Sequence, residues 1–179
     1  MASVVFLRGV NVGGTKVFQP SRLTKELAHL GVINVGAAGT FVVRGGGSHQ
    51  SVRAEFLRQL KFPAEIMVCR GSDITKLVAQ EPFPAPQWEG DVRRFVSVLS
   101  GPPRLRPELP IEVPAGESWQ VRVIRISGRF VLAWWRRLGR SLMDPNSVAE
   151  RRLGVAATTR NWNTIVRIAA VLDRLNLED

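Results

Sequence analysis

Short apolar runs alternate with helical spacings of apolar residues along the first 80 positions of the chain. The runs at residues 4–7, 39–44 and 64–70 predict three strands. After each run the spacing changes to three or four residues, which predicts a helix after each strand. The three helical stripes are Leu23, Leu27 and Leu30; Val52, Phe56 and Leu60; and Ile74, Leu77 and Val78.

Local signals mark the ends of these helices. Ser21 follows a proline and is the expected N-cap of the first helix, which Gly31 ends. Three glycines, 45–47, close the second strand. Residues 71–73, Gly-Ser-Asp, are expected to cap the third helix, which Pro82 stops.

The second half reads mainly as strands. Residues 94–99 predict one strand, and the five prolines between 102 and 114 predict an irregular crossover with at most a short helix. Alternating apolar positions in residues 119–126 and 129–135 predict a hairpin. The apolar doublet Val123-Ile124 changes the phase of the alternation and predicts a β-bulge.

Two helices complete the chain. Asp144-Pro145 is a cap followed by proline at the first helical position, and Gly154 ends this helix. The last helix is expected to begin at residues 159–161. Its buried stripe is Trp162, Ile165, Ala169 and Leu172.

The order of elements predicts an α+β protein with two sheet-based halves. The proline-rich residues 82–89 are the expected connection, so we divide the chain into a βαβαβα subdomain, 1–90, and a hairpin-plus-helix subdomain, 91–179. A single compact domain remains the alternative. No repeat between the halves is visible in the residues.

Charge is the strongest compositional signal. Twenty-five Lys and Arg against fifteen Asp and Glu give a net charge of +10. Between Arg122 and Arg160 nine arginines face only Asp144 and Glu150. The arginine excess has two readings, attraction to phosphates or the codon preference of a GC-rich gene. Cys69 is the single cysteine, which excludes an internal disulfide and makes a reducing cytoplasm the expected compartment.

The segment RGVNVGGTK, residues 8–16, resembles a phosphate-binding loop in part. Its glycines have the required spacing, but Thr15 and Lys16 come in the wrong order, and four more residues separate the loop from the first helix. The segment therefore does not carry the signature of a nucleotide-hydrolysing loop. Two readings remain: an anion contact through the amides of Gly13 and Gly14 with Arg8 or Lys16, or a tight turn in which Asn11 bonds its own backbone.

A polar cluster precedes the last helix, where free backbone amides and the helix dipole would favour an anion. Its members are Thr158, Thr159, Arg160, Asn161 and Asn163. The alternative is structural: Thr159 or Asn161 caps the helix, Trp162 fills the core, and Arg160 pairs with Glu150 or Asp144.

A basic and aromatic segment follows the hairpin. Phosphate contacts by arginine and base stacking on an exposed Trp135 would suit single-stranded nucleic acid. The candidate residues are Arg129, Trp135, Arg136, Arg137 and Arg140. The alternative is a solvated charged edge with Trp134 and Trp135 in the core.

Three motifs carry a resemblance to a known family. RGVNVGG at 8–14, GRS at 139–141 and ATTRNWNT at 157–164 resemble the bacterial domain-of-unknown-function family 1697 over the whole chain. The resemblance implies two ferredoxin-like sheet-and-helix subdomains with a C-terminal helix, and it supplies no activity. Where the family commonly has Ser-Gly-Asn, this chain has Ala38, Gly39 and Thr40.

The residues support no reaction. His29, expected in the first helix, and His49, expected in a loop, have no second ligand nearby, so no metal site or cofactor is expected. Cys69 is expected to be a buried core thiol, and no catalytic set is recognisable. We expect a binding module for phosphate-bearing ligands, nucleic acid first. The alternatives are an enzyme or binder of a small anionic metabolite, in a cleft between the N-terminal glycine loop and the last helix, and a protein-interaction module that uses residues 82–88.

Overall fold

The computed structural model describes residues 1–10, 19–45, 47–88, 90–139 and 143–177. The chain forms two compact units. Unit 1 contains Met1–Gln80 together with Asn163–Asp179, and unit 2 contains Glu81–Trp162. The division therefore falls ten residues before the one drawn from the sequence, and most of the last helix belongs to unit 1.

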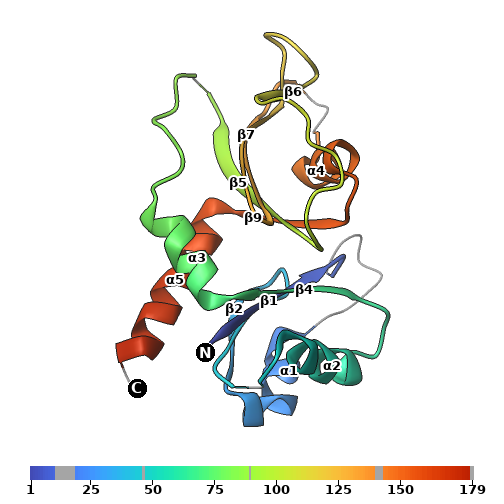
Figure 1. The fold of residues 1–179 in the computed structure, drawn as a ribbon, viewed down its shortest axis with the longest axis vertical. Coiled ribbons are helices and arrows are strands. Elements are labelled where there is room, and N and C mark those ends of the chain that lie inside the picture. The colour runs from blue at the N-terminus through green and yellow to red at the C-terminus, as the bar shows by residue number, and fades with distance from the viewer. Residues whose placement is uncertain (11–18, 46, 89, 140–142, 178–179) are drawn as a thin grey trace. The chain divides into compact units, whose positions relative to one another are not determined.

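Unit 1 is built on a four-stranded antiparallel sheet (Figure 1). Two helices, α1 and α2, join its strands in the order β-α-β-β-α-β, and the strands lie in the order β2-β3-β1-β4, which is the ferredoxin-like arrangement. The elements are β1 (Ser3–Arg8), α1 (Pro20–Glu26), β2 (Val32–Gly36), β3 (Thr40–Val43), α2 (His49–Gln59) and β4 (Glu65–Arg70).

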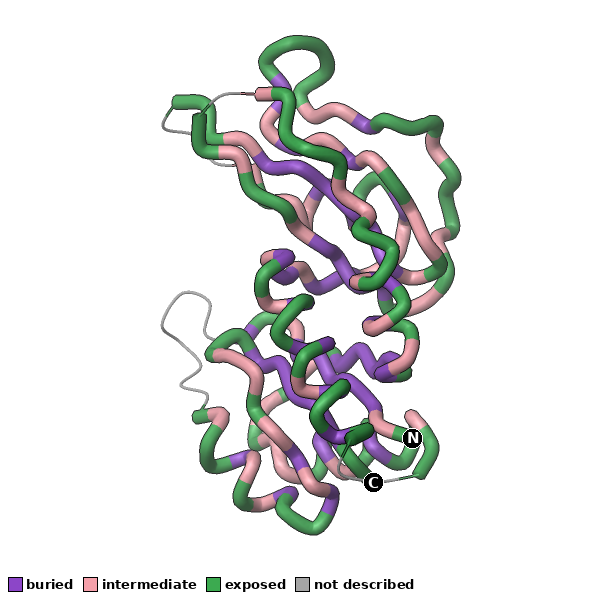
Figure 2. The backbone as a smooth tube through the Cα atoms, turned by 90° about the vertical axis from the view of Figure 1, so that its left-hand side faces the viewer, coloured by how far each residue is buried: buried purple, intermediate pink, exposed green. Residues whose placement is uncertain are grey.

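Both faces of this sheet are buried. On one face Val5, Leu7 and Phe41 form a core with α1 and α2, which lie on the same side of the sheet in Figure 1. On the other face Val4 and Phe6 are also fully buried. Figure 2 shows the result as buried strands within largely exposed loops. The uninterrupted apolar run of β1 is therefore typical of a strand covered on both sides.

Several boundaries in unit 1 differ from the sequence prediction. Gln19 rather than Ser21 is the N-cap of α1, because Pro20 takes the first helical position. Strand β2 was not predicted, since its only buried residue is Val32 and the rest of the strand is partly or fully exposed. His29 lies in a short 3-10 helix after α1, and His49 begins α2 instead of lying in a loop.

Helices α3 (Gly71–Ala79) and α5 (Trp162–Leu177) complete unit 1. The predicted stripe of α5 is confirmed, with Ile165, Ala169 and Leu172 all buried. A Cβ atom built on Gly71 would lie 2.7 Å from Leu172 Cδ2 and 3.0 Å from the Ala2 carbonyl oxygen. The two helices therefore meet at a point where only glycine fits.

Unit 2 repeats the arrangement of unit 1 with one replacement. Its strand order is β6-β7-β8-β5-β9, and β7-β8-β5-β9 corresponds to β2-β3-β1-β4. The irregular segment that ends in β6 stands where unit 1 has its first helix. The elements are β5 (Val92–Leu99), β6 (Ile111–Val113), β7 (Val121–Ser127), β8 (Phe130–Arg136), α4 (Pro145–Leu153) and β9 (Ala157–Asn161). The structure confirms the α+β prediction and the repeat that the residues concealed.

Most sequence signals in unit 2 are confirmed. The hairpin is β7–β8, and its register shifts between Val123 and Arg125, where a bulge was expected. Asp144 caps α4 by accepting hydrogen bonds from the amides of Asn146 and Ser147, and Gly154 ends the helix with φ 70°. The prediction for the proline-rich crossover was wrong in one respect, because this segment contains the strand β6 and no helix among its described residues.

Neither unit carries a helix that could span a membrane, as far as the chain is described.

Replacement of Gly71 by alanine tests the α3–α5 contact. The added methyl group must displace a Leu172 side chain that is 2% exposed, and overpacking of this kind costs about 1–3 kcal/mol. We expect Gly71→Ala to lower the free energy of unfolding by that amount in urea denaturation. Gly101→Ala is the control, because no atom lies within 4 Å of its added Cβ. Equal stability of the two variants would contradict the contact.

Candidate functional site

The polar cluster lies directly before the last helix, as expected, and most of it forms a strand. Residues 157–161 form β9, which pairs with β5, and α5 begins only at Trp162. Thr158, Thr159 and Arg160 therefore lie in a strand directly before the helix and not in its first turn. The polar residues that predicted a helix start form a strand instead, because the backbone of residues 157–161 pairs with β5.

Several side chains of this strand form hydrogen bonds with residues of unit 2. Arg160 is 7% exposed and donates hydrogen bonds from Nη1 to Thr158 Oγ1 at 2.8 Å and to the Thr159 carbonyl oxygen at 2.9 Å. Burial lowers the pKa of Arg160 to about 10. Thr159 Oγ1 lies 2.7 Å from Ser97 Oγ and donates to Asn146 Oδ1. Trp162 is buried, as the structural alternative proposed.

Other members of the predicted anion sites are exposed or lie outside the described residues. Asn163 is exposed in the first turn of α5, and Asn161 is half-buried. Arg8 forms an ion pair with Glu65, with 2.6 Å between Nη1 and Oε2. The loop residues Asn11, Gly13, Gly14 and Lys16 fall outside the described part of the chain.

The predicted nucleic-acid surface is not assembled as expected. Trp135 is 9% exposed and donates from Nε1 to the Met143 carbonyl oxygen, so it is not an exposed stacking surface, and both tryptophans are buried as the alternative expected. Arg129 donates from Nε to the Leu99 carbonyl oxygen at 2.8 Å. Arg137 is exposed. Arg140 falls outside the described residues.

Arg136 has a structural role in unit 2. Its guanidinium lies over the Trp119 ring, with 4.2 Å between Cζ and the ring centroid. It also donates to the carbonyl oxygens of Trp119 and Glu117. Arg136 therefore holds the loop before β7 against the end of β8.

Tryptophan and arginine side chains gather on the sheet face of unit 2 opposite α4. Cross-strand pairing places Arg122 and Arg94 on either side of Trp134. Phe83 and Trp88 pack edge-on against Trp134, with centroid distances of 5.5 and 5.7 Å. The sequence missed this cluster because its members come from four separate segments.

We call residues 82–88 the strap. Two of its aromatic residues, Phe83 and Trp88, are packed down on the sheet face, while Pro84 and Ala85 between them are exposed. The packing of its aromatic anchors counts against the prediction that this segment docks a partner protein.

Two hollows open beside the strap, and they share Trp88 and Arg122. The strap hollow has a volume of about 290 Å³ and reaches Ile124 and Trp134. The neighbouring hollow has a volume of about 580 Å³ and contains Glu112, Glu117, Trp119 and Arg136 in its wall. Arg122 Nε lies 3.3 Å from Glu112 Oε1, so the charges in the second hollow are balanced.

A hollow in unit 1 lies at the start of α2, and we call it the α2 hollow. Its volume is about 460 Å³, and its wall contains Ser48, His49, Gln50 and Arg70 together with the first three residues of the chain. Ser48 caps α2 by accepting a hydrogen bond from the Ser51 amide. Neither the wall nor the first turn of α2 contains an acidic residue.

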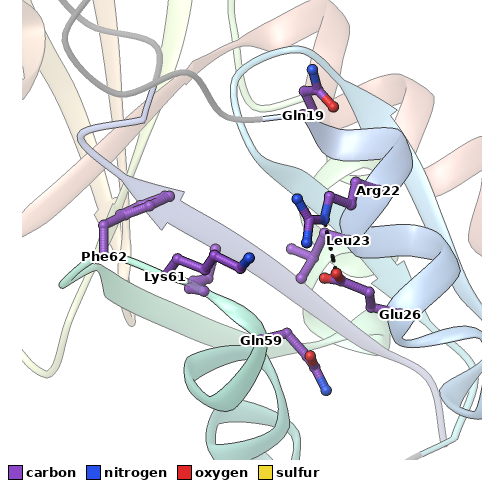
Figure 3. A pocket seen from close by; sticks show the side chains of 8 residues that line it. Gln19, Arg22, Leu23, Glu26, Gln59, Lys61 and Phe62 are labelled. Atoms are coloured by element: carbon purple, nitrogen blue, oxygen red, sulfur yellow. Dashed lines mark hydrogen bonds and ion pairs between the residues drawn. The ribbon is translucent and has the colours of Figure 1, made fainter.

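A further hollow of unit 1 separates α1 from the segment after α2 (Figure 3). Arg22 and Glu26 form an ion pair on one side, with 2.9 Å between Nε and Oε1, and Lys61 faces them from the other side. Its volume is about 240 Å³, and its charge is only partly positive because Glu26 is in the wall. The described residues contain no group of three His, Cys, Asp or Glu side chains that could hold a metal ion.

The fold is that of an α+β protein with two related ferredoxin-like sheets. A family model described as "Protein of unknown function (DUF1697)" matches residues 1–125. The chain belongs to this family. The match includes the RGVNVGG motif and ends before the other two motifs of the predicted resemblance.

The fold is shared with a solved structure. The chain is similar to "conserved bacterial protein SP0830 from Streptococcus pneumoniae", with a TM-score of 0.57 and 18% sequence identity. The similarity covers 96% of this chain and 98% of the other. No curated protein matches the chain.

Substitution of the two neighbouring residues Arg136 and Arg137 tests which of these arginines stabilises the fold. Arg136→Ala removes hydrogen bonds to two carbonyl oxygens, and we expect it to lower the free energy of unfolding by about 1–3 kcal/mol. Arg137→Ala changes an exposed side chain and should stay within about 0.5 kcal/mol of the parent. Thermal and urea unfolding measure both. A destabilisation by Arg137→Ala as large as that by Arg136→Ala would refute the structural assignment.

Proposed function

We propose that this protein binds phosphate-bearing ligands, with nucleic acid as the first class, through the α2 hollow of unit 1. The observation that carries the proposal is the absence of acidic residues from a hollow that combines a helix start with Arg70. The net charge of +10 favours the same class of ligand, because it raises the local concentration of polyanions.

The local chemistry suits a phosphate group. The first backbone amides of an α-helix have no partner within the helix and carry partial positive charge. Gly45 and Gly47 precede α2, and Gly47 has φ 73°, so the backbone turns into the helix without side chains that would keep a ligand away. Arg70 adds an exposed guanidinium, whose fork of N–H donors matches phosphate oxygens.

This loop satisfies a requirement that RGVNVGGTK does not. A phosphate loop opens directly onto a helix, and the glycines at 45–47 are followed at once by the N-cap Ser48. The sequence contained this signal as Gly-Gly-Gly-Ser between a predicted strand and a predicted helix.

A small anionic metabolite is the second candidate. A volume of about 460 Å³ lies within the range of small-molecule sites. The earlier placement of this ligand, against the N-terminal glycine loop, depends on residues 11–18 and stays a prediction.

Fluorescence anisotropy with labelled single-stranded and duplex oligonucleotides over a salt series tests the proposal. We expect the logarithm of affinity to fall linearly with the logarithm of salt concentration, by about 0.7 per phosphate contact on single strands and about 0.9 on duplex DNA. Arg70→Ala should weaken binding about three- to tenfold and make the slope smaller by about one contact.

Arg174→Ala is the matched control, because it removes the same charge from an exposed position of α5 in the same unit. Its affinity should stay within about twofold of the parent. Competition by inorganic phosphate and by adenosine monophosphate separates the two candidates. Nucleic-acid binding that Arg70→Ala leaves unchanged would falsify the site, and no binding of any of these probes at low salt would end the proposal.

A further inference from the structure

Trp134 occupies the centre of a row of side chains across the sheet of unit 2. Glu112 on β6, Arg122 on β7, Trp134 on β8 and Arg94 on β5 are successive cross-strand neighbours. Directly paired residues of an antiparallel sheet point to the same face, so these four side chains share the face opposite α4. This row places an aromatic ring between two cations.

The strap covers this row at two points. Phe83 packs on Trp134 beside Arg94, whose Cζ lies 6.0 Å from the Phe83 centroid. Trp88 packs on Trp134 beside Arg122, whose Cζ lies 5.3 Å from the Trp88 centroid. The strap hollow opens between the strap and the sheet, with indole rings, prolines and Ile124 in its wall.

The indole N–H of Trp134 has no hydrogen-bond acceptor among the described residues. Trp134 is 2% exposed, and its Nε1 atom is the buried side-chain polar atom for which the structure gives no partner. An unsatisfied buried donor is costly and uncommon in folded proteins. Trp135, the next residue, lies on the opposite face and has its N–H bonded to the Met143 carbonyl oxygen.

We propose that the strap hollow binds a nucleobase, carried by a free nucleotide or by a single strand. The aromatic wall favours a flat ring, and the volume of about 290 Å³ suits one small ring system rather than a larger ligand. The edge of a base carries both donors and acceptors. The wall supplies donors from Arg122, and the side-chain amide of Gln87 offers both a donor and an acceptor.

The charge around the hollow favours a base over a free carboxylate. Arg122 is already 3.3 Å from Glu112, so a ligand carboxylate would compete with an existing partner. A neutral carbonyl acceptor can instead use the remaining N–H groups of Arg122, since a guanidinium has five. Arg94 at the other end of the row is exposed and forms no ion pair within the described residues, which leaves it available to a phosphate of the same ligand.

This site is independent of the α2 hollow. It recognises the base, whereas the α2 hollow recognises phosphate, and the two sites lie in different units. All five tryptophans belong to unit 2, so quenching of intrinsic fluorescence reports on the strap hollow and its surroundings. Nucleosides carry no phosphate and probe this site alone.

The test is a titration of the whole protein with adenosine, guanosine, cytidine and uridine, followed by tryptophan fluorescence and calorimetry. We expect saturable binding of at least one nucleoside, with a dissociation constant of the order of 0.1 mM for a ligand of this size. Trp134→Phe keeps an aromatic ring but removes part of the indole surface that lines the hollow, and it should weaken that nucleoside about three- to tenfold.

Trp135→Phe is the matched control on the other face of β8. It should lower stability, because it removes the bond to Met143, and leave nucleoside affinity within about twofold. Ala85→Phe adds a large ring at an exposed position of the wall and should block binding in a folded protein even if Trp134→Phe fails to fold.

The source of the base follows from a comparison of a mononucleotide with a short single-stranded oligonucleotide. Affinity at least tenfold higher for the oligonucleotide identifies a single strand, and equal affinity identifies a free nucleotide; either supports the site. Absence of saturable binding by all four nucleosides overturns the proposal. Equal weakening by Trp134→Phe and Trp135→Phe also overturns it, because the effect would then not come from this face.

Discussion

The need to cover both faces of each sheet governs this structure. In unit 1 the central strand β1 is apolar at successive positions, and Val4 and Val5, which point to opposite faces, are both fully buried. In unit 2 the same holds for Leu132 and Ala133 of β8. A strand with two apolar faces is stable only between two layers, because exposed apolar surface costs free energy in water.

The two units meet this need differently on one side. Helices α1 and α2 cover one face in unit 1, and α4 covers the corresponding face in unit 2. On the second face of unit 2, Trp134 is covered by aromatic side chains of the strap, Trp119 packs against Trp88, and Arg122 and Arg136 lie over these rings. Separate side chains leave gaps where a helix would pack continuously, and the strap hollow is one of these gaps.

Structural use of arginine changes the meaning of the basic charge. Arg129, Arg136 and Arg160 donate hydrogen bonds to carbonyl or hydroxyl oxygens of unit 2. A dense run of arginines in the sequence is therefore not by itself a basic surface. The α2 hollow has one arginine in its wall, Arg70, and its positive character comes also from a helix start and from the absence of carboxylates.

The sequence by itself determined the α+β class, most strands and helices, the bulge of β7 and both ends of α4, because these depend on local spacing and capping. Tertiary structure decided the rest. Pairing with β5 makes residues 157–161 a strand. Trp135 packs in the core with residues of α4 and does not lie on an open surface. The row of Arg122, Trp134 and Arg94 depends on the register of three strands. Residues so far apart in sequence become neighbours only when these strands pair.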